Sequence, residues 1–361
     1  MKLAVVAGEA SGDLHAAEVI RELKKLDPSL RTFGIGGDLL AREGTEILHH
    51  AREMGIVGLF NVIRHLGMFR RVFRELAERI EQERPDVVLL VDYPDFNLRM
   101  AKRCKEMGLR VVYYISPQIW AWRRGRVKHI AKYVDHMIVI FPFEEDFYRQ
   151  HNVAVTYVGH PLIDELTPRR HESQPGVLRV ALLPGSRRME VEALLPPMLK
   201  AVAILKREQA VDAFIIQAPT IDFSQWSAAA LGGVRIVPHD QGEALSTADI
   251  ALSSSGTATL ECAIVGTPVV VMYRLSPMTY QLAKWLVKLP HFSLVNIVAG
   301  KRIVPELLQH DVTGEKIAAA VREVLVDDDR VRADLAAVKA KLGEKGASRR
   351  AAEAIMGVVR G

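Results

Sequence analysis

Short apolar runs alternate along the chain with longer segments in which apolar residues recur every three or four positions. Runs rich in Val and Ile between helical patterns are typical of parallel βαβ units. The run from Val87 to Val91 is apolar on both faces, as expected when helices cover both sides of a sheet. The pattern therefore predicts doubly wound α/β domains. The predicted strands span residues 2–7, 32–36, 86–92, 110–115, 136–141, 154–158, 179–183, 213–217, 234–237, 250–253 and 268–272.

The 361 residues exceed what one hydrophobic core usually organises, and the predicted strands fall into two series. Between the series, the segment from Asp164 to Gly176 is polar, charged and interrupted by two prolines, which favours a linker. We therefore predict two Rossmann-like domains, residues 1–165 and 177–340, whose strand-to-helix loops face a cleft. The helical pattern of residues 341–361 predicts a C-terminal helix that packs back on the first domain or on a partner subunit of a homodimer.

The composition, 49% hydrophobic and 25% charged residues, is that of a folded globular protein. The apolar run at the N-terminus is too short for a signal peptide, and lysines interrupt the most apolar long stretch, Leu275 to Ala299, so we expect no spanning helix. Cys104 and Cys262 lie far apart, which favours a reducing, cytoplasmic environment without a disulfide or a cysteine metal site. The net charge of +5 favours phosphate-bearing partners but does not distinguish nucleic acid, anionic lipid and nucleotide.

The loop after the first predicted strand, Gly8 to His15, carries three candidate functional side chains in a glycine turn. Its glycines permit a tight turn and close approach of a ligand. The spacing matches neither a Walker loop nor the G-x-G-x-x-G fingerprint of dinucleotide sites. Glu9, Ser11 and Asp13 at the end of a strand indicate a functional loop, and the alternative is that Asp13 only caps a helix.

The segment from Asp92 to Asn97 places two carboxylates in a proline-stiffened loop after another predicted strand. Asp92 and Asp95 offer one positioned base and one orienting group, as proton abstraction from a hydroxyl requires. Their spacing is not that of a metal-binding D-x-D pair. The alternative is a turn in which Asp95 or Asn97 caps the next helix.

Aromatic and basic residues gather in the stretch 113–126, which contains Gln118 and Trp120 as candidate substrate-binding residues. Aromatic faces and guanidinium groups suit stacking on a sugar or base and gripping a phosphate. Packing of the tryptophans in the core is the alternative. A single cluster without a nucleic-acid module is weak evidence for a nucleic-acid interface.

Two glycine turns open helices in the second predicted domain. At the first, Gly185, Ser186 and Arg187 join a strand to a helix. Backbone N–H groups at such a helix start favour an anion, and the Arg187 guanidinium adds a bidentate phosphate donor.

The second turn, Ser255, Gly256 and Thr257, repeats the arrangement at another strand-to-helix junction. Glu261, about one turn into the following helix, suits both hydroxyls of a ribose. Capping chemistry explains either loop alone. Two such loops in one domain favour a nucleotide diphosphate.

These loops belong to a set of seven sequence blocks: Gly8 to Asp13, Asp92 to Asn97, Ile115 to Trp122, Phe141 to Glu144, Gly159 to Leu162, Leu183 to Arg187 and Ser254 to Glu261. In order and spacing, the set closely resembles the lipid A disaccharide synthase family, and the resemblance covers essentially the whole chain. Seven blocks together are far more specific than any one loop.

The resemblance implies a glycosyltransferase-B fold that works without a metal or another cofactor. It implies that UDP-2,3-diacylglucosamine is joined to 2,3-diacylglucosamine 1-phosphate (lipid X) through a β-1,6 bond, with release of UDP. The domain of residues 1–165 then binds the acceptor and faces the membrane, and the domain of residues 177–340 binds the UDP-sugar.

By position, the resemblance makes Asp95 the family's essential carboxylate, and Arg187 and Asn296 its polar residues on the nucleotide side. Glu261 is similar to the ribose-binding glutamate of the related murein glycosyltransferase.

The implied reaction converts an α-linked donor into a β bond, which requires an inverting displacement and deprotonation of the acceptor's 6-hydroxyl. We predict that Asp95 is the base, with Glu9 and Asp13 as substitutes. Arg187 and the two helix starts then stabilise the leaving diphosphate.

Both implied substrates carry acyl chains, so we expect a peripheral protein on the inner face of the cytoplasmic membrane. Residues 59–80 form an amphipathic pattern in which arginines flank an apolar stripe. Much of that stripe is ordinary core in such a fold, but extra apolar residues such as Phe60 and Met68 indicate a lipid-facing end. The stretch Tyr273 to Lys301 is a second candidate for contact with an anionic membrane surface.

Two alternatives stay open at this point. One is a soluble enzyme of similar architecture, such as a UDP-N-acetylglucosamine epimerase, which has no need of lipid contact. The other is a basic nucleic-acid-binding protein, which only the net charge favours, so we expect no nucleic-acid partner.

Overall fold

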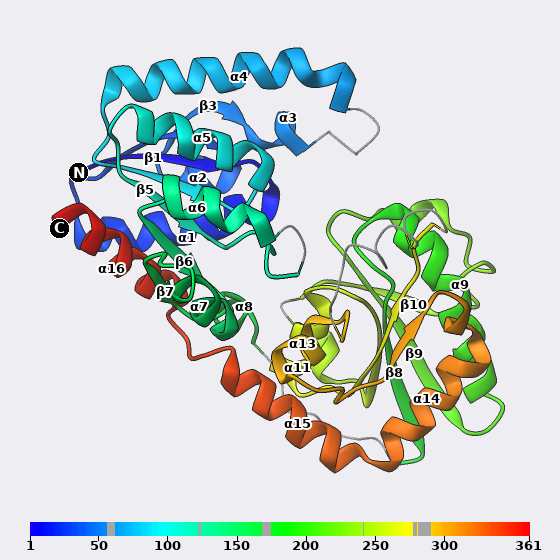
Figure 1. Ribbon diagram of the computed structural model, residues 1–361. Coiled ribbons are helices and arrows are strands. Elements are labelled where there is room, and N and C mark those ends of the chain that lie inside the picture. The colour runs from blue at the N-terminus through cyan, green and yellow to red at the C-terminus, as the bar shows by residue number, and fades with distance from the viewer. Residues whose placement is uncertain (56–61, 122–123, 168–174, 241, 277–279, 281–289) are drawn as a thin grey trace. The chain divides into compact units, whose positions relative to one another are not determined.

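The computed structural model describes residues 1–55, 62–121, 124–167, 175–240, 242–276, 280 and 290–361. The chain divides into two compact units of similar size. The first unit comprises Met1–Pro161 together with Glu344–Gly361, and the second comprises Leu162–Gly343. Figure 1 shows this division in its colours, since the red C-terminal helix belongs with the blue to green N-terminal elements.

The first unit is built on a sheet whose described strands are all parallel, in the order β3-β2-β1-β4-β5-β6-β7. Both β1 and β4 are buried along almost their whole length, as their apolar sequences predict. The strands are β1 (Lys2–Ala7), β2 (Arg31–Gly36), β3 (Glu46–His50), β4 (Val87–Val91), β5 (Val111–Tyr114), β6 (His136–Val139) and β7 (Val155–Tyr157).

Helices cover both faces of this sheet (Figure 1). Helices α4, α5 and α6 pack side by side on one face, and α1 packs against α16 on the other. The helices of the unit are α1 (Ala10–Leu26), α2 (Asp38–Arg42), α3 (Ala51–Gly55), α4 (Val62–Glu83), α5 (Pro94–Glu106), the short 3-10 helix η1 (Arg124–Arg126), α6 (Val127–Tyr133), α7 (Pro142–Arg149) and α16 (Ala347–Arg360).

Helix α16 is joined to the first unit by polar contacts as well as by its apolar face. The Arg350 Nε donates to the carbonyl of Val158 at 2.8 Å, and the Ser348 hydroxyl lies 3.1 Å from the Glu18 carboxylate. At the other end of α16, Arg110 donates to the carbonyl of Val358 at 2.8 Å. The end of the chain therefore completes the unit that the beginning of the chain forms.

The second unit has its own parallel sheet, in the order β10-β9-β8-β11-β12-β13. Its strands are β8 (Val177–Leu183), β9 (Ala210–Gln217), β10 (Arg235–Pro238), β11 (Ile250–Ser254), β12 (Val269–Tyr273) and β13 (Glu306–Leu308). Its described helices are α8 (Leu162–Glu165), α9 (Arg188–Leu205), η2 (Phe223–Gln225), α10 (Glu243–Ser246), α11 (Ala258–Val265), α13 (Leu294–Ala299), η3 (Gln309–Asp311), α14 (Gly314–Val326) and α15 (Asp328–Lys341).

Both sheets contain a point where the strand order reverses. In the first sheet the reversal falls between β1 and β4, and in the second it falls between β8 and β11. Ligands of open α/β sheets bind beyond the carboxyl ends of the strands at such switch points. The loops that follow these four strands are therefore the first places to search for a site.

The predicted fold class is confirmed, and the eleven predicted strands lie within a few residues of observed ones. Two observed strands, β3 and β13, were missed. Strand β3 carries the polar residues Glu46, His49 and His50, and β13 has only three residues, so neither shows a clear apolar run. The observed division falls before α8, and the centre of the predicted linker, residues 168–174, lies outside the described residues. Within the part of the chain that the structure describes, every helix is too short or too polar to span a bilayer.

Candidate active site

The loops at the first switch point interlock. A Cβ atom on Gly8, after β1, would lie 2.6 Å from the ring of Tyr93, after β4, so only glycine fits there. Tyr93 has a left-handed backbone, with φ of 50°, and its hydroxyl donates to the carbonyl of Met54 at 3.3 Å. The ring of Tyr93 therefore fixes the spacing between the two loops.

Carboxylates of both loops share this switch point. Burial, together with the negative charge of nearby Glu9, raises the pKa of Asp92 to about 6. Glu9 is exposed at the N-cap position of α1, where its side chain makes no capping bond. The carboxylates that follow β1 and β4 thus lie close enough to interact electrostatically.

Asp95 lies in the first turn of α5 with its side chain 75% exposed. The helix start is secured by a different residue, because the buried Asn97 amide donates to the carbonyls of Asp92 at 2.7 Å and of Val91 at 3.1 Å. Of the two residues that the sequence offered to secure the start of this helix, Asp95 and Asn97, it is therefore Asn97 that does so. The Asp95 carboxylate points to solvent and pairs with the guanidinium of Arg126.

Asp13 has a structural role in the first unit. Its carboxylate is buried and accepts hydrogen bonds from the backbone N–H groups of Gly37, Leu39 and Leu40, at 2.6, 3.0 and 3.2 Å. These bonds tie α1 to the start of α2. Asp13 therefore caps α2 rather than its own helix, and no catalytic role of Asp13 is supported. Ser11, in the first turn of α1, is exposed.

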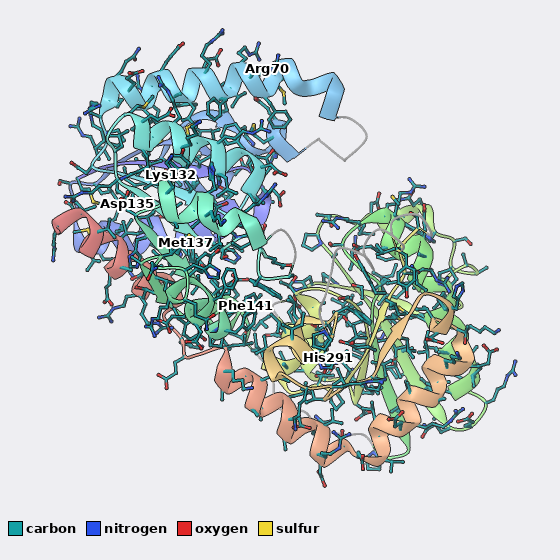
Figure 2. The ribbon with its side chains drawn as sticks, viewed as in Figure 1. Arg70, Lys132, Asp135, Met137, Phe141 and His291 are labelled. Atoms are coloured by element: carbon teal, nitrogen blue, oxygen red, sulfur yellow. The ribbon has the colours of Figure 1, made fainter. Side chains whose placement is uncertain are left out.

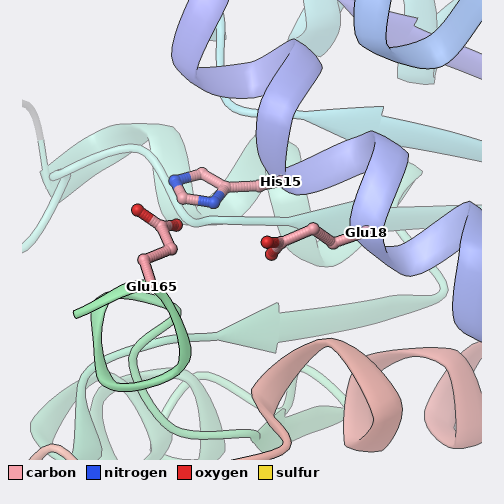
Figure 3. A group of neighbouring side chains, drawn as sticks. All are labelled: His15, Glu18 and Glu165. Atoms are coloured by element: carbon pink, nitrogen blue, oxygen red, sulfur yellow. The ribbon is translucent and has the colours of Figure 1, made fainter. Parts of the chain in front are cut away.

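Two histidines lie near α1 in the first unit. Figure 3 shows His15 and Glu18 projecting from that helix, and Glu165, also labelled there, belongs to the second unit. Burial, together with the charge of nearby His15, lowers the pKa of His160 to about 3. His160 is therefore neutral at physiological pH, and its ring packs against Phe141 at 5.2 Å. Within either unit taken alone, the described residues include no group of three metal-ligating side chains close enough to share an ion.

The loop after β5 rests on a buried polar network. Trp120 is only 6% exposed, and its indole Nε1 donates to the carboxyl group of Glu144 at 3.0 Å. Burial raises the pKa of Glu144 to about 8, so its carboxyl group is largely protonated at neutral pH. The ring of Trp120 packs on Phe143 at 4.8 Å. Trp120 thus packs in the core, the alternative that the sequence left open, and its contact with substrate stays a prediction.

Residues around Trp120 differ in their access to solvent. Gln118, two positions earlier, is exposed, so a substrate contact through its side chain is sterically open. The hydroxyl groups of Ser116 and Tyr148 lie 2.7 Å apart in the interior. Phe141, labelled in Figure 2, is buried at the start of α7, where the Glu144 carboxyl accepts its backbone N–H.

At the second switch point, the loop after β8 makes a tight turn into α9. Gly185 has a φ of 126°, and a Cβ there would lie 2.5 Å from the carboxylate of Glu190. That carboxylate accepts the backbone N–H of Ser186 at 3.2 Å and fixes the turn from within the helix. Arg187, at the N-cap position of α9, has a side chain that is 81% exposed, with its nearest carboxylate oxygen, on Glu190, at 3.5 Å.

The loop after β11 has the same plan. The Ser255 hydroxyl donates to the carbonyl of Phe292 at 3.0 Å, and Gly256 has a φ of 153°, a backbone conformation that favours glycine. Thr257 is exposed at the N-cap position of α11. Backbone donors of this turn and of the turn at Arg187 lie beyond two neighbouring strands, β8 and β11.

Glu261, in the first turn of α11, pairs with a residue that sequence reasoning missed. His239, after β10, lies 3.1 Å from the Glu261 carboxylate, and this hydrogen bond raises the pKa of His239. The Glu261 side chain is 13% exposed. An acidic residue held by a histidine at the end of the sheet is suited to accept hydrogen bonds from sugar hydroxyls.

Asn296 is fully buried. Its amide oxygen accepts the backbone N–H of Ile303 at 2.8 Å, and its amide nitrogen donates to the carbonyl of Val304 at 3.1 Å. The residue thus ties α13 to the segment before β13. Its contact with the nucleotide stays a prediction. The observed hydrogen bonds favour a structural role, in which Asn296 holds the segment before β13 in place.

Comparison with known proteins decides the family. The sequence model described as "Lipid-A-disaccharide synthetase" matches residues 3–357. A lipid-A-disaccharide synthase of Geobacter sulfurreducens is 41% identical over 370 residues, covering 98% of this chain and 96% of the relative. One of Anaeromyxobacter dehalogenans is 44% identical over 378 residues, covering 99% and 98%. The chain belongs to the lipid-A-disaccharide synthase family.

Membership of the lipid-A-disaccharide synthase family gives the reaction. The protein is a glycosyltransferase that forms the lipid A disaccharide from UDP-2,3-diacylglucosamine and lipid X. The predicted family and reaction are confirmed, and the same matches decide for the synthase over the epimerase alternative.

Solved structures that resemble this chain have low sequence identity to it, so they show its fold but not its function. The glycosyltransferase of kitacinnamycin matches with a TM-score of 0.67 at 18% identity, covering 99% of this chain and 98% of its own. A putative UDP-N-acetylglucosamine 2-epimerase from Listeria monocytogenes also reaches 0.67, at 14% identity, covering 98% and 95%. The glycosyltransferase-B architecture is thus common to transferases and epimerases, and the sequence decides between them.

Proposed function

We propose that the first unit binds the lipid X acceptor and supplies the catalytic base, and that the second unit binds the UDP part of the donor. The observation that carries this proposal is the chemistry of the switch points. The first exposes carboxylates, and the second exposes glycine turns, helix starts and an arginine. A hydroxyl that must lose a proton requires a carboxylate as base. A departing diphosphate requires helix starts and an arginine that stabilise its negative charge.

The proposed step is a single inverting displacement. The acceptor's 6-oxygen forms a bond to the donor's anomeric carbon while the bond from that carbon to the diphosphate breaks. The bonding electrons leave with UDP, and the proton of the 6-hydroxyl passes to Asp95. Asp95 is favoured over Glu9 and Asp13 because it is exposed on a helix start that Asn97 holds rigid, whereas Asp13 is bound by three backbone donors.

On the donor side, the starts of α9 and α11 stabilise the diphosphate. Fixed backbone N–H groups and helix dipoles favour an anion without reorganisation when charge develops. Arg187 adds a mobile, exposed guanidinium. Glu261, oriented by His239, accepts hydrogen bonds from the ribose hydroxyls.

Replacing Asp95 by Asn tests the base. Because general base catalysis contributes about 10²- to 10⁴-fold, turnover is expected to fall by that factor, while UDP binding measured by calorimetry stays unchanged. Glu106→Gln, at the C-terminal end of α5, where the carboxylate lies 3.8 Å from the Lys102 ammonium, serves as the control and is expected to retain activity. Normal turnover by Asp95→Asn would assign the proton to another group.

We further propose that the first unit adsorbs on the anionic inner face of the cytoplasmic membrane, where acylated substrates reside. The exposed arginines of α4, among them Arg70 in Figure 2, support this surface. Leu76 and Ile80 are fully buried, so the C-terminal half of the predicted stripe is core. Met68 is half-buried against that core, and the side chains of residues 56–66 lie outside those described.

Charge reversal on α4 tests this adsorption. Each basic residue near an anionic surface contributes about 1 kcal/mol, so replacing Arg70, Arg71 and Arg74 by Glu is expected to abolish sedimentation with anionic vesicles. Neutral vesicles and elevated salt serve as controls. Equal sedimentation of the wild type with neutral and anionic vesicles would contradict the proposal.

A further inference from the structure

An open pocket of 370 Å³ lies on the first unit beside the proposed base. It is formed where the first turns of α5 approach η1 and α6. Asp95, Leu98 and Arg99 line it from α5, and Arg126 and His129 line it from the other side. Three of these five side chains are basic, so the pocket has the character of an anion site with one carboxylate at its rim.

The basic groups of the pocket are not equally engaged. Arg126 pairs with Asp95, and the His129 Nε2 donates to the carbonyl of Leu98 at 2.8 Å, which leaves its other ring nitrogen on the opposite edge. Arg99 is exposed, and none of the residues that the structure describes forms a hydrogen bond or ion pair with its guanidinium. It follows Asp95 by four positions, so the two side chains lie on one face of α5.

We propose that this pocket binds the 1-phosphate of the acceptor through Arg99 and Arg126, with His129 beside them. The inference rests on the proposed function, in which Asp95 takes the proton of the 6-hydroxyl. In the acceptor sugar, C1 and C5 both flank the ring oxygen, so the phosphate on C1 and the hydroxymethyl group on C5 share one edge of the ring. A base that contacts the 6-hydroxyl therefore has the 1-phosphate close to it, and Arg99 and Arg126 are the cations that line the pocket beside Asp95.

Phosphate binding also changes the state of Asp95. A phosphate monoester carries a charge of about −1.5 to −2 at neutral pH, whereas the Asp95 carboxylate carries −1. The phosphate therefore competes for the Arg126 guanidinium, with which it forms bidentate bonds. Release from Arg126 leaves the carboxylate available to the hydroxyl. The acceptor thus prepares its own base, and an acceptor without a phosphate leaves Asp95 paired.

The test compares two acceptors, 2,3-diacylglucosamine 1-phosphate and 2,3-diacylglucosamine, in a UDP-release assay at saturating donor. The wild type is expected to prefer the phosphorylated acceptor in kcat/KM. Because a charge-assisted hydrogen bond corresponds to about a tenfold to hundredfold effect, Arg99→Gln is expected to reduce this preference by that factor. Arg126→Gln is expected to reduce it similarly, and Arg99→Lys to restore part of it.

Arg103→Gln is the matched control, because Arg103 lies on the same helix outside the pocket and pairs with Glu81 at 3.3 Å. It is expected to keep the wild-type preference. An unchanged preference in both Arg99→Gln and Arg126→Gln, with normal UDP binding, would overturn the phosphate site. Loss of adsorption to anionic vesicles in Arg99→Gln without a change in preference would assign the pocket to lipid headgroups and overturn it equally. If Asp95→Asn retained turnover, the proposed base would fail, whereas an altered preference in the Arg99 variant would still support the site.

Discussion

At the first switch point, the loops after β1 and β4 bring Glu9, Asp92 and Asp95 to one end of the sheet. The loops after β8 and β11 instead bring glycines, hydroxyl side chains and two helix starts. The sheets share the same parallel plan and the same reversal of strand order, so the backbone gives each unit a switch point of the kind at which ligands of open α/β sheets bind. The residues of the loops fix the charge of each switch point. In the function proposed above, two copies of one architecture serve opposite tasks, removal of a proton and stabilisation of an anion.

Glycine substitutions disturb the loops of each switch point separately. The largest loss of function is expected at the second switch point. Gly185→Ala combines a strained φ with a collision with Glu190, a cost of about 1–3 kcal/mol. UDP affinity is therefore expected to fall by about tenfold to a hundredfold in calorimetry. Gly8→Ala, which displaces the ring of Tyr93, is expected to lower kcat and leave UDP affinity unchanged.

The control for both substitutions is Gly357→Ala, because a Cβ at this helical position meets no neighbouring atom within 4 Å. It is expected to leave both UDP affinity and kcat unchanged. If Gly8→Ala weakened UDP binding as strongly as Gly185→Ala does, the division of tasks between the two switch points would be wrong.

Substitution of Arg187 tests whether the second switch point binds the diphosphate of the donor. Arg187→Gln is expected to weaken UDP binding by about tenfold, the effect of one charge-assisted hydrogen bond, and to leave uridine binding unchanged. Arg188→Gln is the neighbouring control, because Arg188 pairs with Glu192 at 2.7 Å. Equal losses for UDP and uridine would show that Arg187 does not contact the diphosphate.

A pH series distinguishes the buried Glu144 of the first unit from the exposed carboxylates of that unit. The folded pKa of Glu144, about 8, lies above the ordinary value of about 4.5, so the folded state holds a proton that the unfolded state has lost between these values. The free energy of unfolding is therefore expected to fall as pH rises through this window, by at most about 1.4 kcal/mol per pH unit.

Urea unfolding at pH 5 and pH 8 measures this contribution. Glu144→Gln cannot ionise, so its stability relative to the wild type is expected to improve as pH rises. Glu145→Gln, whose carboxylate in the wild type pairs with Arg149 at 2.8 Å on the surface, is the control without such a trend. A pH-independent difference between Glu144→Gln and the wild type would show that Glu144 is ionised throughout.

The fold was predictable wherever a strand is buried on both faces. Runs such as Val87–Val91 admit only apolar residues, so the sequence itself marks the centre of each sheet. At the sheet edges this constraint weakens. Among the described strands, β3 lies at the edge beside β2, and it tolerates Glu46 and His50, so the apolar pattern on which prediction depends is absent there.

The candidate loops were predictable for a related reason, since each follows a recognisable central strand. The fate of individual side chains in them was not. Whether Trp120 stacks on a sugar or packs on Phe143 depends on residues that α7 brings from further along the chain. The pairing of Asp95 with Arg126 and that of Glu261 with His239 likewise join segments more than twenty residues apart. The local spacing of residues in the sequence does not predict such pairs.

The return of α16 to the first unit has a consequence for biosynthesis. On the ribosome, all residues of the second unit are translated before the helix that covers α1 exists. The N-terminal half must therefore wait, with one flank of its core uncovered, while the C-terminal half completes its own sheet. Premature termination near residue 343 would consequently damage the unit that was made first.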